Sequence, residues 1–150
     1  MNRVLGVGYE GRDLAGFLAE VDAAGVEVVV DVRLTPISRK RGFSKRALAS
    51  ALAGIGVAYR HEPALGNPKA NRPGFAGTAR EWSAARGRYE ALLSALAAQE
   101  ALARVAEAAL TARVAVLCFE ADQRRCHRDV VLSRLVELSA VPEGAGGQGG

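Results

Sequence analysis

The chain has 150 residues, of which 49% are hydrophobic and 24% are charged, and its formal net charge is +4. This length fits one globular domain with its own core. No stretch is long or apolar enough to span a bilayer, and the N-terminus lacks the apolar segment of a signal peptide. We therefore expect a soluble cytoplasmic protein that does not contact a membrane, with a mild preference for anionic partners.

Hydrophobic periodicity predicts a strand over Val4–Tyr9, followed by a helix that Asp13 caps and Gly25 ends. Residues 26–30 are rich in β-branched side chains and predict a second strand that stops at Asp31. Near-continuous apolar runs separated by a helix are typical of a parallel sheet buried on both faces.

Ser44 is expected to cap a short helix, and residues 57–60 predict a weak third strand. Residues 61–77 are rich in Pro and Gly and predict a long loop. Residues 78–112 have an Ala-rich helical pattern, which we expect to break near Gly87 and again near Gln99.

Residues 114–118 predict the last strand, and a final helix should stop before Pro142. The alternation predicts an α/β fold: an open, mostly parallel sheet with helices on both faces, and a long loop and Ala-rich helical insertion before the last strand. We expect one domain over residues 1–142 and a disordered Gly-rich tail over 143–150. Ligands of such sheets bind beyond the carboxyl ends of the strands.

Two short motifs suggest phosphate chemistry, and both have counter-arguments. Residues 6–11 match G-x-G-x-x-G, with Asp31 where a dinucleotide site would need an acid. Few residues precede Gly6, however, and Glu10 would repel a pyrophosphate, so a strand ending in a Gly-rich turn is favoured. Cys118 and Arg124 have the C-x5-R spacing of cysteine phosphatases, but the loop between them carries two acids and no glycine.

The cysteines have several interpretations. The cluster of Cys118, Glu120, Asp122, Cys126 and His127 suits zinc or iron by residue type, but C-x7-C-H matches no common structural zinc spacing. We expect both thiols to be reduced, with Cys118 packed in the core and Cys126 near a helix N-terminus, where the dipole lowers a thiol pKa. Metal binding is left open.

Charged side chains gather at the predicted strand ends. The carboxylates of Glu10, Asp31, Glu120 and Asp122 could act as general bases or stabilise positive charge, or they could form an ion-pair network with nearby arginines. Residues 33–80 contain ten Lys or Arg residues and one acid, and this basic segment leads into a helix N-terminus, which suits phosphates.

These segments together resemble a known family. Residues 8–12, 31–33, 38–39, 42–44 and 65–68, together with Cys118-x-Glu120 and Cys126-His127-Arg128, follow the order of the family catalogued as domain of unknown function 488. The resemblance implies an α/β domain in which these residues cluster. Some archaeal relatives are associated with excision of oxidised pyrimidines from DNA, so the resemblance also suggests a DNA glycosylase.

The leading hypothesis is a DNA-acting hydrolase that excises oxidised pyrimidines or uracil, with nucleic acid or another phosphate-bearing ligand as partner and no cofactor. The alternatives are a cysteine- or metal-dependent enzyme on a small anion and a non-catalytic nucleic-acid-binding module. The candidate catalytic residues are Glu10, Asp31, Glu120, Cys126 and His127. The candidate substrate-binding residues are Tyr9, Arg12, Arg33, Arg39, Lys40, Arg41, Lys45, Asn67 and Arg128.

Overall fold

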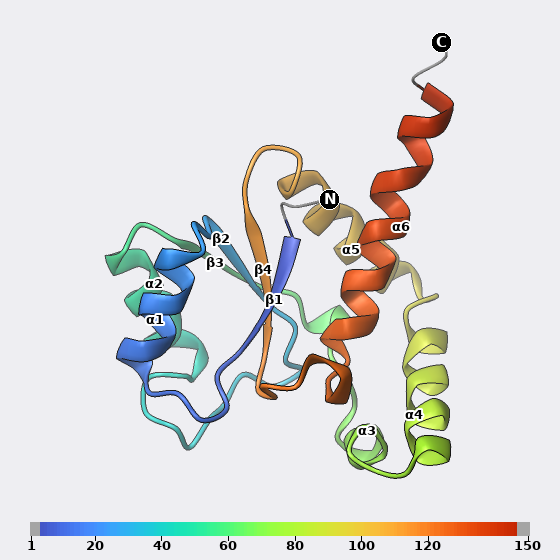
Figure 1. Cartoon of the computed structure of the whole chain (residues 1–150), viewed down its shortest axis with the longest axis horizontal. Helices are drawn as coiled ribbons and strands as arrows, with labels where there is room; N and C mark the ends of the chain where they lie inside the picture. Colours follow the sequence, from blue (N-terminus) through green and yellow to red (C-terminus); the bar gives the residue numbers. More distant parts are fainter. Residues whose placement is uncertain (1–3, 147–150) are drawn as a thin grey trace.

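A four-stranded sheet, all parallel, forms the centre of the molecule (Figure 1). The computed structural model describes residues 4–146, with side chains to residue 138. The strands are β1 (Val4–Gly8), β2 (Val28–Asp31), β3 (Ala58–His61) and β4 (Val114–Cys118), and their order in the sheet is β1-β4-β2-β3. The predicted open parallel sheet is therefore confirmed.

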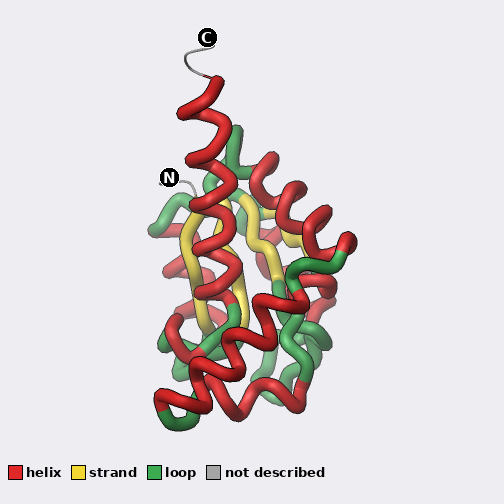
Figure 2. The backbone as a smooth tube through the Cα atoms, turned by 90° about the vertical axis from the view of Figure 1, so that its right-hand side faces the viewer, coloured by secondary structure: helices red, strands yellow, loops and turns green. Residues whose placement is uncertain are grey.

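Helices cover both faces of the sheet, as predicted. Figure 1 shows α1 (Leu14–Ala23) and α2 (Lys45–Gly54) on one side, and α5 (Leu96–Ala108) and α6 (Arg128–Gly146) on the other. Figure 2 shows that the last turns of α6 extend past the rest of the chain. No helix of the described residues is long and apolar enough to cross a membrane.

Local sequence signals explain where several helices begin and end. The side chain of Asp13 accepts a hydrogen bond from the backbone N–H of Gly16 and caps α1. Gly25 follows that helix with a φ of 70°, the left-handed conformation that suits a helix end. At α4 (Ala79–Leu92), Thr78 and Glu81 form a capping box.

Two apolar clusters sandwich the sheet because successive side chains of each strand point to opposite faces. In β4, Val114 and Val116 pack with the α4–α6 side, while Ala115 and Leu117 pack with α1 and α2. Every residue of β2 and β4 is buried. Burial on both faces is what the near-continuous apolar runs indicated.

Three expectations about the helices were wrong. The predicted loop over residues 61–77 contains two 3₁₀ turns, η1 (Pro63–Leu65) and η2 (Lys69–Asn71), and the short helix α3 (Arg72–Phe75). Helix α4 runs through Gly87 without a break, and the interruption falls before α5, at residues 93–95. Helix α6 continues past Pro142 to Gly146, so part of the expected tail is helical, while residues 147–150 lie outside the described residues.

Candidate functional site

The carboxyl ends of the strands meet at one edge of the sheet, and a pocket of about 310 Å³ opens there. In the strand register, Gly8 pairs with Cys118 and Asp31 pairs with Leu117, which brings three loops together. The pocket is lined by Tyr9, Arg33, Leu34, Thr35, Ile37, Ser38, Arg39, Asn67, Arg72, Phe75, Cys118, Phe119, Glu120, Arg125, Cys126 and His127.

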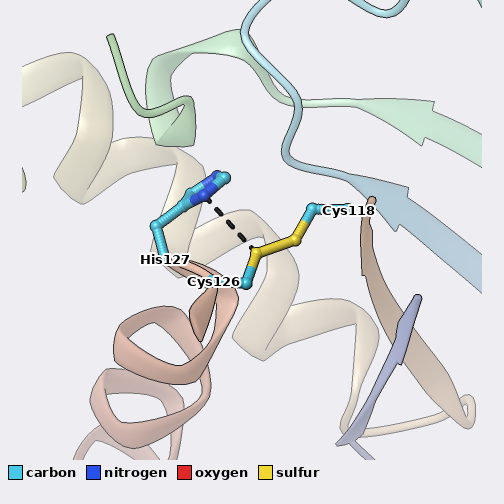
Figure 3. Close-up of side chains that lie close together, drawn as sticks. All are labelled: Cys118, Cys126 and His127. Carbon is cyan, nitrogen blue, oxygen red and sulfur yellow. Dashed lines mark hydrogen bonds between the residues drawn. A yellow bond between two sulfur atoms is a disulfide. The ribbon is translucent and has the colours of Figure 1, made fainter. Parts of the chain in front are cut away.

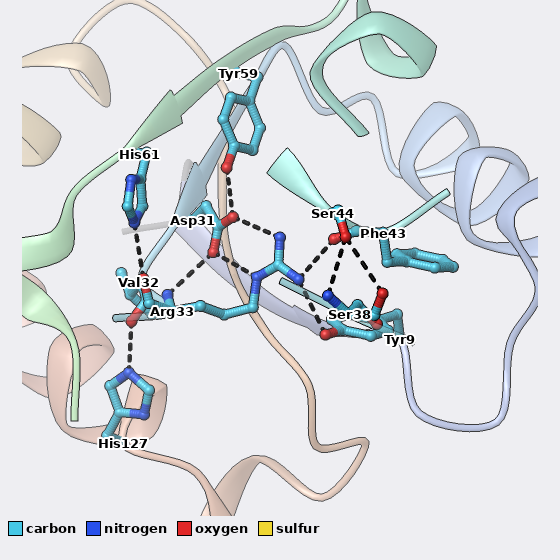
Figure 4. A network of polar contacts seen from close by, with 10 residues as sticks. All are labelled: Tyr9, Asp31, Val32, Arg33, Ser38, Phe43, Ser44, Tyr59, His61 and His127. Carbon is cyan, nitrogen blue, oxygen red and sulfur yellow. Dashed lines mark hydrogen bonds and ion pairs between the residues drawn. The ribbon is translucent and has the colours of Figure 1, made fainter. Parts of the chain in front are cut away.

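Asp31 lies beneath this pocket and is fully buried. Its carboxylate accepts two hydrogen bonds from the Arg33 guanidinium, at 2.9 and 2.7 Å, and one from the Tyr59 hydroxyl (Figure 4). Burial by itself lowers the pKa of Arg33, but hydrogen bonding and the charge of Asp31 raise it above its ordinary value. Arg33 therefore stays charged, and its hydrogen bonds to Asp31 hold the loop after β2 in place.

The ring of Tyr9 is also occupied by protein contacts. It stacks on Phe43 with ring centroids 4.4 Å apart, and Phe119 packs against it edge-on. Its hydroxyl accepts a hydrogen bond from Arg33. Tyr9 lines the pocket, but only 3% of its surface is exposed. Phe119 also lines the pocket, and its ring is accessible, with 41% of the residue's surface exposed.

His127 sits at the buried floor of the pocket in one defined tautomer. Its Nε2 lies 2.8 Å from the carbonyl oxygen of Val32, which can only accept, so Nε2 carries the proton (Figure 4). Burial lowers the pKa of His127 to about 4, which the bond to Val32 opposes only in part. The imidazole is therefore neutral at pH 7, with the lone pair of Nδ1 available.

The two cysteines meet beside this imidazole. Cys118, at the end of β4, and Cys126, just before α6, are joined in a disulfide (Figure 3). This corrects our expectation that both thiols would be reduced: the sheet edge and the turn before α6 bring the sulfurs into contact. Sγ of Cys126 lies 3.6 Å from Nδ1 of His127, and both cysteines are buried.

Arg128 fixes the loop that carries Glu120. Its side chain is buried and donates to the backbone carbonyl oxygens of Glu120 and Ala121, at 2.6 and 3.3 Å. The carboxyl of Glu120 lines the pocket, 3.6 Å from Sγ of Cys118. Burial raises the pKa of Glu120 above its usual range, while a backbone hydrogen bond and the charge of Arg128 lower it.

The other candidate residues lie around this site rather than in it. Glu10 is exposed and accepts a hydrogen bond from the backbone N–H of Ala121, which ties the loop after β1 to the loop after β4. Lys45 is exposed at the start of α2. The remaining three line a separate depression near the start of α1: Arg12, Lys40 and Arg41.

Several residues that line the pocket were not among the sequence candidates, and those with chemistry to offer are Arg72, Phe75, Phe119 and Arg125. Arg72 and Phe75 belong to α3, inside the stretch expected to be a loop, and Arg125 directly precedes the Cys126-His127 pair. Arg125 could have been found from the sequence, because it directly precedes the Cys126-His127-Arg128 motif. For α3 no such signal existed, because its four residues, Arg-Pro-Gly-Phe, include two that disfavour helix interiors.

The fold and site together define a parallel α/β domain with an arginine-rimmed pocket at the carboxyl edge of its sheet. The model of the family described as domain of unknown function DUF488 matches residues 13–135. Since this is most of the chain, the protein belongs to that family, and the suspected resemblance is confirmed. No curated protein and no solved structure matches the chain.

Proposed function

We propose that the pocket admits one base of a nucleic acid and that the chain is a DNA-acting hydrolase which excises damaged pyrimidines or uracil. The observation that carries the proposal is the composition of the pocket lining. Among its described residues, Glu120 is the one acid, while exposed arginines stand around it: Arg39, Arg72 and Arg125. Such a rim suits backbone phosphates, and a single recessed acid suits chemistry on a base that has left the stack.

The accessible ring at the pocket is the second support. Phe119 lines the pocket and keeps 41% of its surface exposed. An extruded base needs an aromatic or apolar face to replace the stacking it loses. We assign this role to Phe119 rather than Tyr9, because Phe43 already covers one face of the Tyr9 ring.

Glu120 then acts as the general base of the hydrolysis. Its carboxylate takes a proton from a water molecule whose oxygen bonds to C1′ of the sugar, while the bond from C1′ to the base breaks and its electron pair stays on the base. The base then receives the proton that Glu120 took from the water, which restores the carboxylate. We do not assign this role to Asp31, because Arg33 and Tyr59 engage both of its oxygens beneath the pocket.

Strand scission of labelled duplexes tests the proposal. Duplexes with one uracil or one oxidised pyrimidine are incubated with the protein and then treated with alkali, which cleaves abasic sites. We expect scission at the modified base, and Glu120→Gln should slow it by about a hundredfold or more without weakening binding. The matched control is Glu107→Gln, an exposed carboxylate on α5. Absence of scission on every substrate, or full activity of Glu120→Gln, contradicts the enzyme.

Two other functions predict different outcomes in the same assays. A non-catalytic nucleic-acid-binding module binds in a salt-dependent manner without scission, and Arg39→Ala or Arg72→Ala then lowers the salt slope by about one each. A cysteine enzyme acting on a small anion is favoured by the contact between Cys126 and His127 at the pocket floor. It predicts that alkylation of reduced Cys126 abolishes turnover, whereas the Glu120 mechanism does not use that thiol.

A further inference from the structure

Two thiol sulfurs and one imidazole nitrogen converge at the floor of the pocket. The ligand atoms of Cys118, Cys126 and His127 all lie within 4.8 Å of one another, and all three residues are buried (Figure 3). We propose that, when the two cysteines are reduced, these residues bind one divalent cation of the zinc class. Two thiolates and one imidazole are ligands that zinc prefers, and three protein ligands are typical of zinc sites that keep an open position.

The imidazole is already oriented for such a site. A histidine that binds a metal through one ring nitrogen usually donates the other N–H to a carboxylate or a backbone carbonyl. In His127, Nε2 donates to the carbonyl oxygen of Val32 at 2.8 Å, which leaves Nδ1 facing the sulfur of Cys126 at 3.6 Å. The outer contact therefore selects the tautomer that can bind a cation.

Hydrogen-bond donors also face both sulfurs. The guanidinium of Arg128 donates to Sγ of Cys118 at 3.2 Å, and the backbone N–H of Arg128 donates to Sγ of Cys126 at 3.5 Å. Donors in these positions stabilise thiolates, which are the form that binds metal. Two thiolates also neutralise a divalent cation, so the bound centre adds no net charge beside the buried guanidinium.

The spacing of the two backbones suits a bridge longer than a sulfur–sulfur bond. The Cα atoms of Cys118 and Cys126 are 7.3 Å apart, whereas disulfides usually span about 4.4–6.8 Å between Cα atoms. A cation between the sulfurs adds two metal–sulfur bonds of about 2.3 Å each, which a wider backbone separation accommodates.

The fourth position of the cation would face the pocket, because all three ligands line it. The carboxylate of Glu120, 3.6 Å from Sγ of Cys118, is the nearest further acidic group in this lining. Binding to the dithiol form releases two protons, one from each thiol. The disulfide form must first gain two electrons and two protons from a reductant, so oxidation removes the site.

Cobalt and zinc titrations of the full chain test the proposal. The protein is reduced with a phosphine, freed of metal with a chelator and titrated with Co²⁺ in the absence of nucleic acid. We expect one Co²⁺ per chain, near-ultraviolet bands from sulfur-to-cobalt charge transfer, visible bands of tetrahedral intensity, and displacement by Zn²⁺. Protein left in the disulfide form should show none of these signals.

Variants identify the ligands. Cys118→Ser, Cys126→Ser and His127→Gln should each weaken Co²⁺ binding by more than the tenfold to about a hundredfold that loss of an outer contact costs. The control is His61→Gln, since His61 contacts the carbonyl of Arg33 outside the cluster. Failure of the reduced wild-type protein to bind Co²⁺ with thiolate bands overturns the proposal without reference to any variant. The proposal is also overturned if the variants of all three residues bind Co²⁺ as tightly as the wild-type protein does. Neither result bears on damaged-base excision.

Discussion

The carboxylate of Asp31 is the most strongly held acid in the site. It is fully buried and accepts hydrogen bonds from Arg33 and Tyr59. Because removal of one partner leaves the other charge buried and unpaired, Asp31→Asn should lower the free energy of unfolding by about 3–5 kcal/mol, measured by urea denaturation. Asp22→Asn, at an exposed carboxylate on α1, should stay within about 0.5 kcal/mol of wild type. If both substitutions lower the free energy of unfolding by the same amount, the buried pair does not stabilise the fold in this way.

Tyr59 gives a pH dependence whose sign follows from its surroundings. Burial and the bond to Asp31 raise the pKa of the Tyr59 phenol above its ordinary value of about 10. The unfolded chain therefore loses this proton at a lower pH than the folded chain. The contribution of Tyr59 to the free energy of unfolding is therefore fully present below a pH of about 10, and it declines as the pH rises above that value. In urea titrations from pH 8 to pH 11, the stability gap between wild type and Tyr59→Phe should narrow. A constant gap contradicts the assignment.

For single residues, sequence reasoning predicted the positions of the candidate side chains better than the contacts that they make. The pattern predicted that Asp31, Glu120 and His127 would follow strand ends, and parallel strands bring such ends together. It left open whether the acids catalyse or pair with arginines. Asp31 pairs because Arg33, two residues later, folds back onto it, and that geometry depends on the loop after β2 rather than on any periodicity.

Gly8 connects the end of β1 to the loop that carries Glu120. A Cβ atom at Gly8 would overlap the backbone carbonyl of Glu120. Because these are backbone atoms, they cannot move aside as the end of a flexible side chain could. Gly8→Ala should therefore destabilise the fold by about 1–3 kcal/mol and displace the Glu120 loop. Urea denaturation measures the first effect, and loss of scission at modified bases measures the second. Unchanged stability would show that the two loops do not approach this closely.

Gly87 gives the opposite expectation within α4. A Cβ there meets nothing within 4 Å, and the residue is exposed in the middle of the helix. Gly87→Ala should raise the free energy of unfolding by about 0.5–1 kcal/mol. It serves as the matched substitution for Gly8→Ala, since both add one methyl group. A destabilised Gly87→Ala protein would mean that α4 is interrupted at this residue.

Among the elements, sequence patterns predicted the strands more accurately than the helix ends. The last strand has the predicted bounds because it is a short run of buried apolar residues that includes two valines, Val114 and Val116. The break expected at Gly87 is absent because a single glycine costs a helix only about 1 kcal/mol. Packing of Ala85 and Tyr89 on either side, both fully buried, offsets that cost.

The whole molecule should unfold as one cooperative unit, because both apolar clusters share the central strands β2 and β4. Its single tryptophan, Trp82, reports on this unit from α4: its indole N–H donates to the carbonyl of Arg124, in the turn before α6. Urea transitions followed by Trp82 fluorescence and by far-ultraviolet circular dichroism should therefore coincide. Two separate midpoints would show that α4 and the turn detach before the sheet unfolds.

The overall architecture was predictable, but the order of the strands was not. Alternating strand and helix patterns predict a parallel sheet with helices on both faces. They do not predict which strand occupies which place in the sheet, since β2 and β4 are both mostly apolar and both are buried throughout. The placement of β4 between β1 and β2 is a tertiary property, and α6 packs against both β1 and β4.

That strand order has a consequence for synthesis on the ribosome. β1 and β2 emerge early, yet neither pairs with the other, and their common partner is β4, at residues 114–118. A nascent chain therefore carries two unpaired apolar strand edges until most of its length has left the exit tunnel. Chaperones that shield such edges should stay bound until β4 appears, and chains truncated before it should aggregate rather than fold.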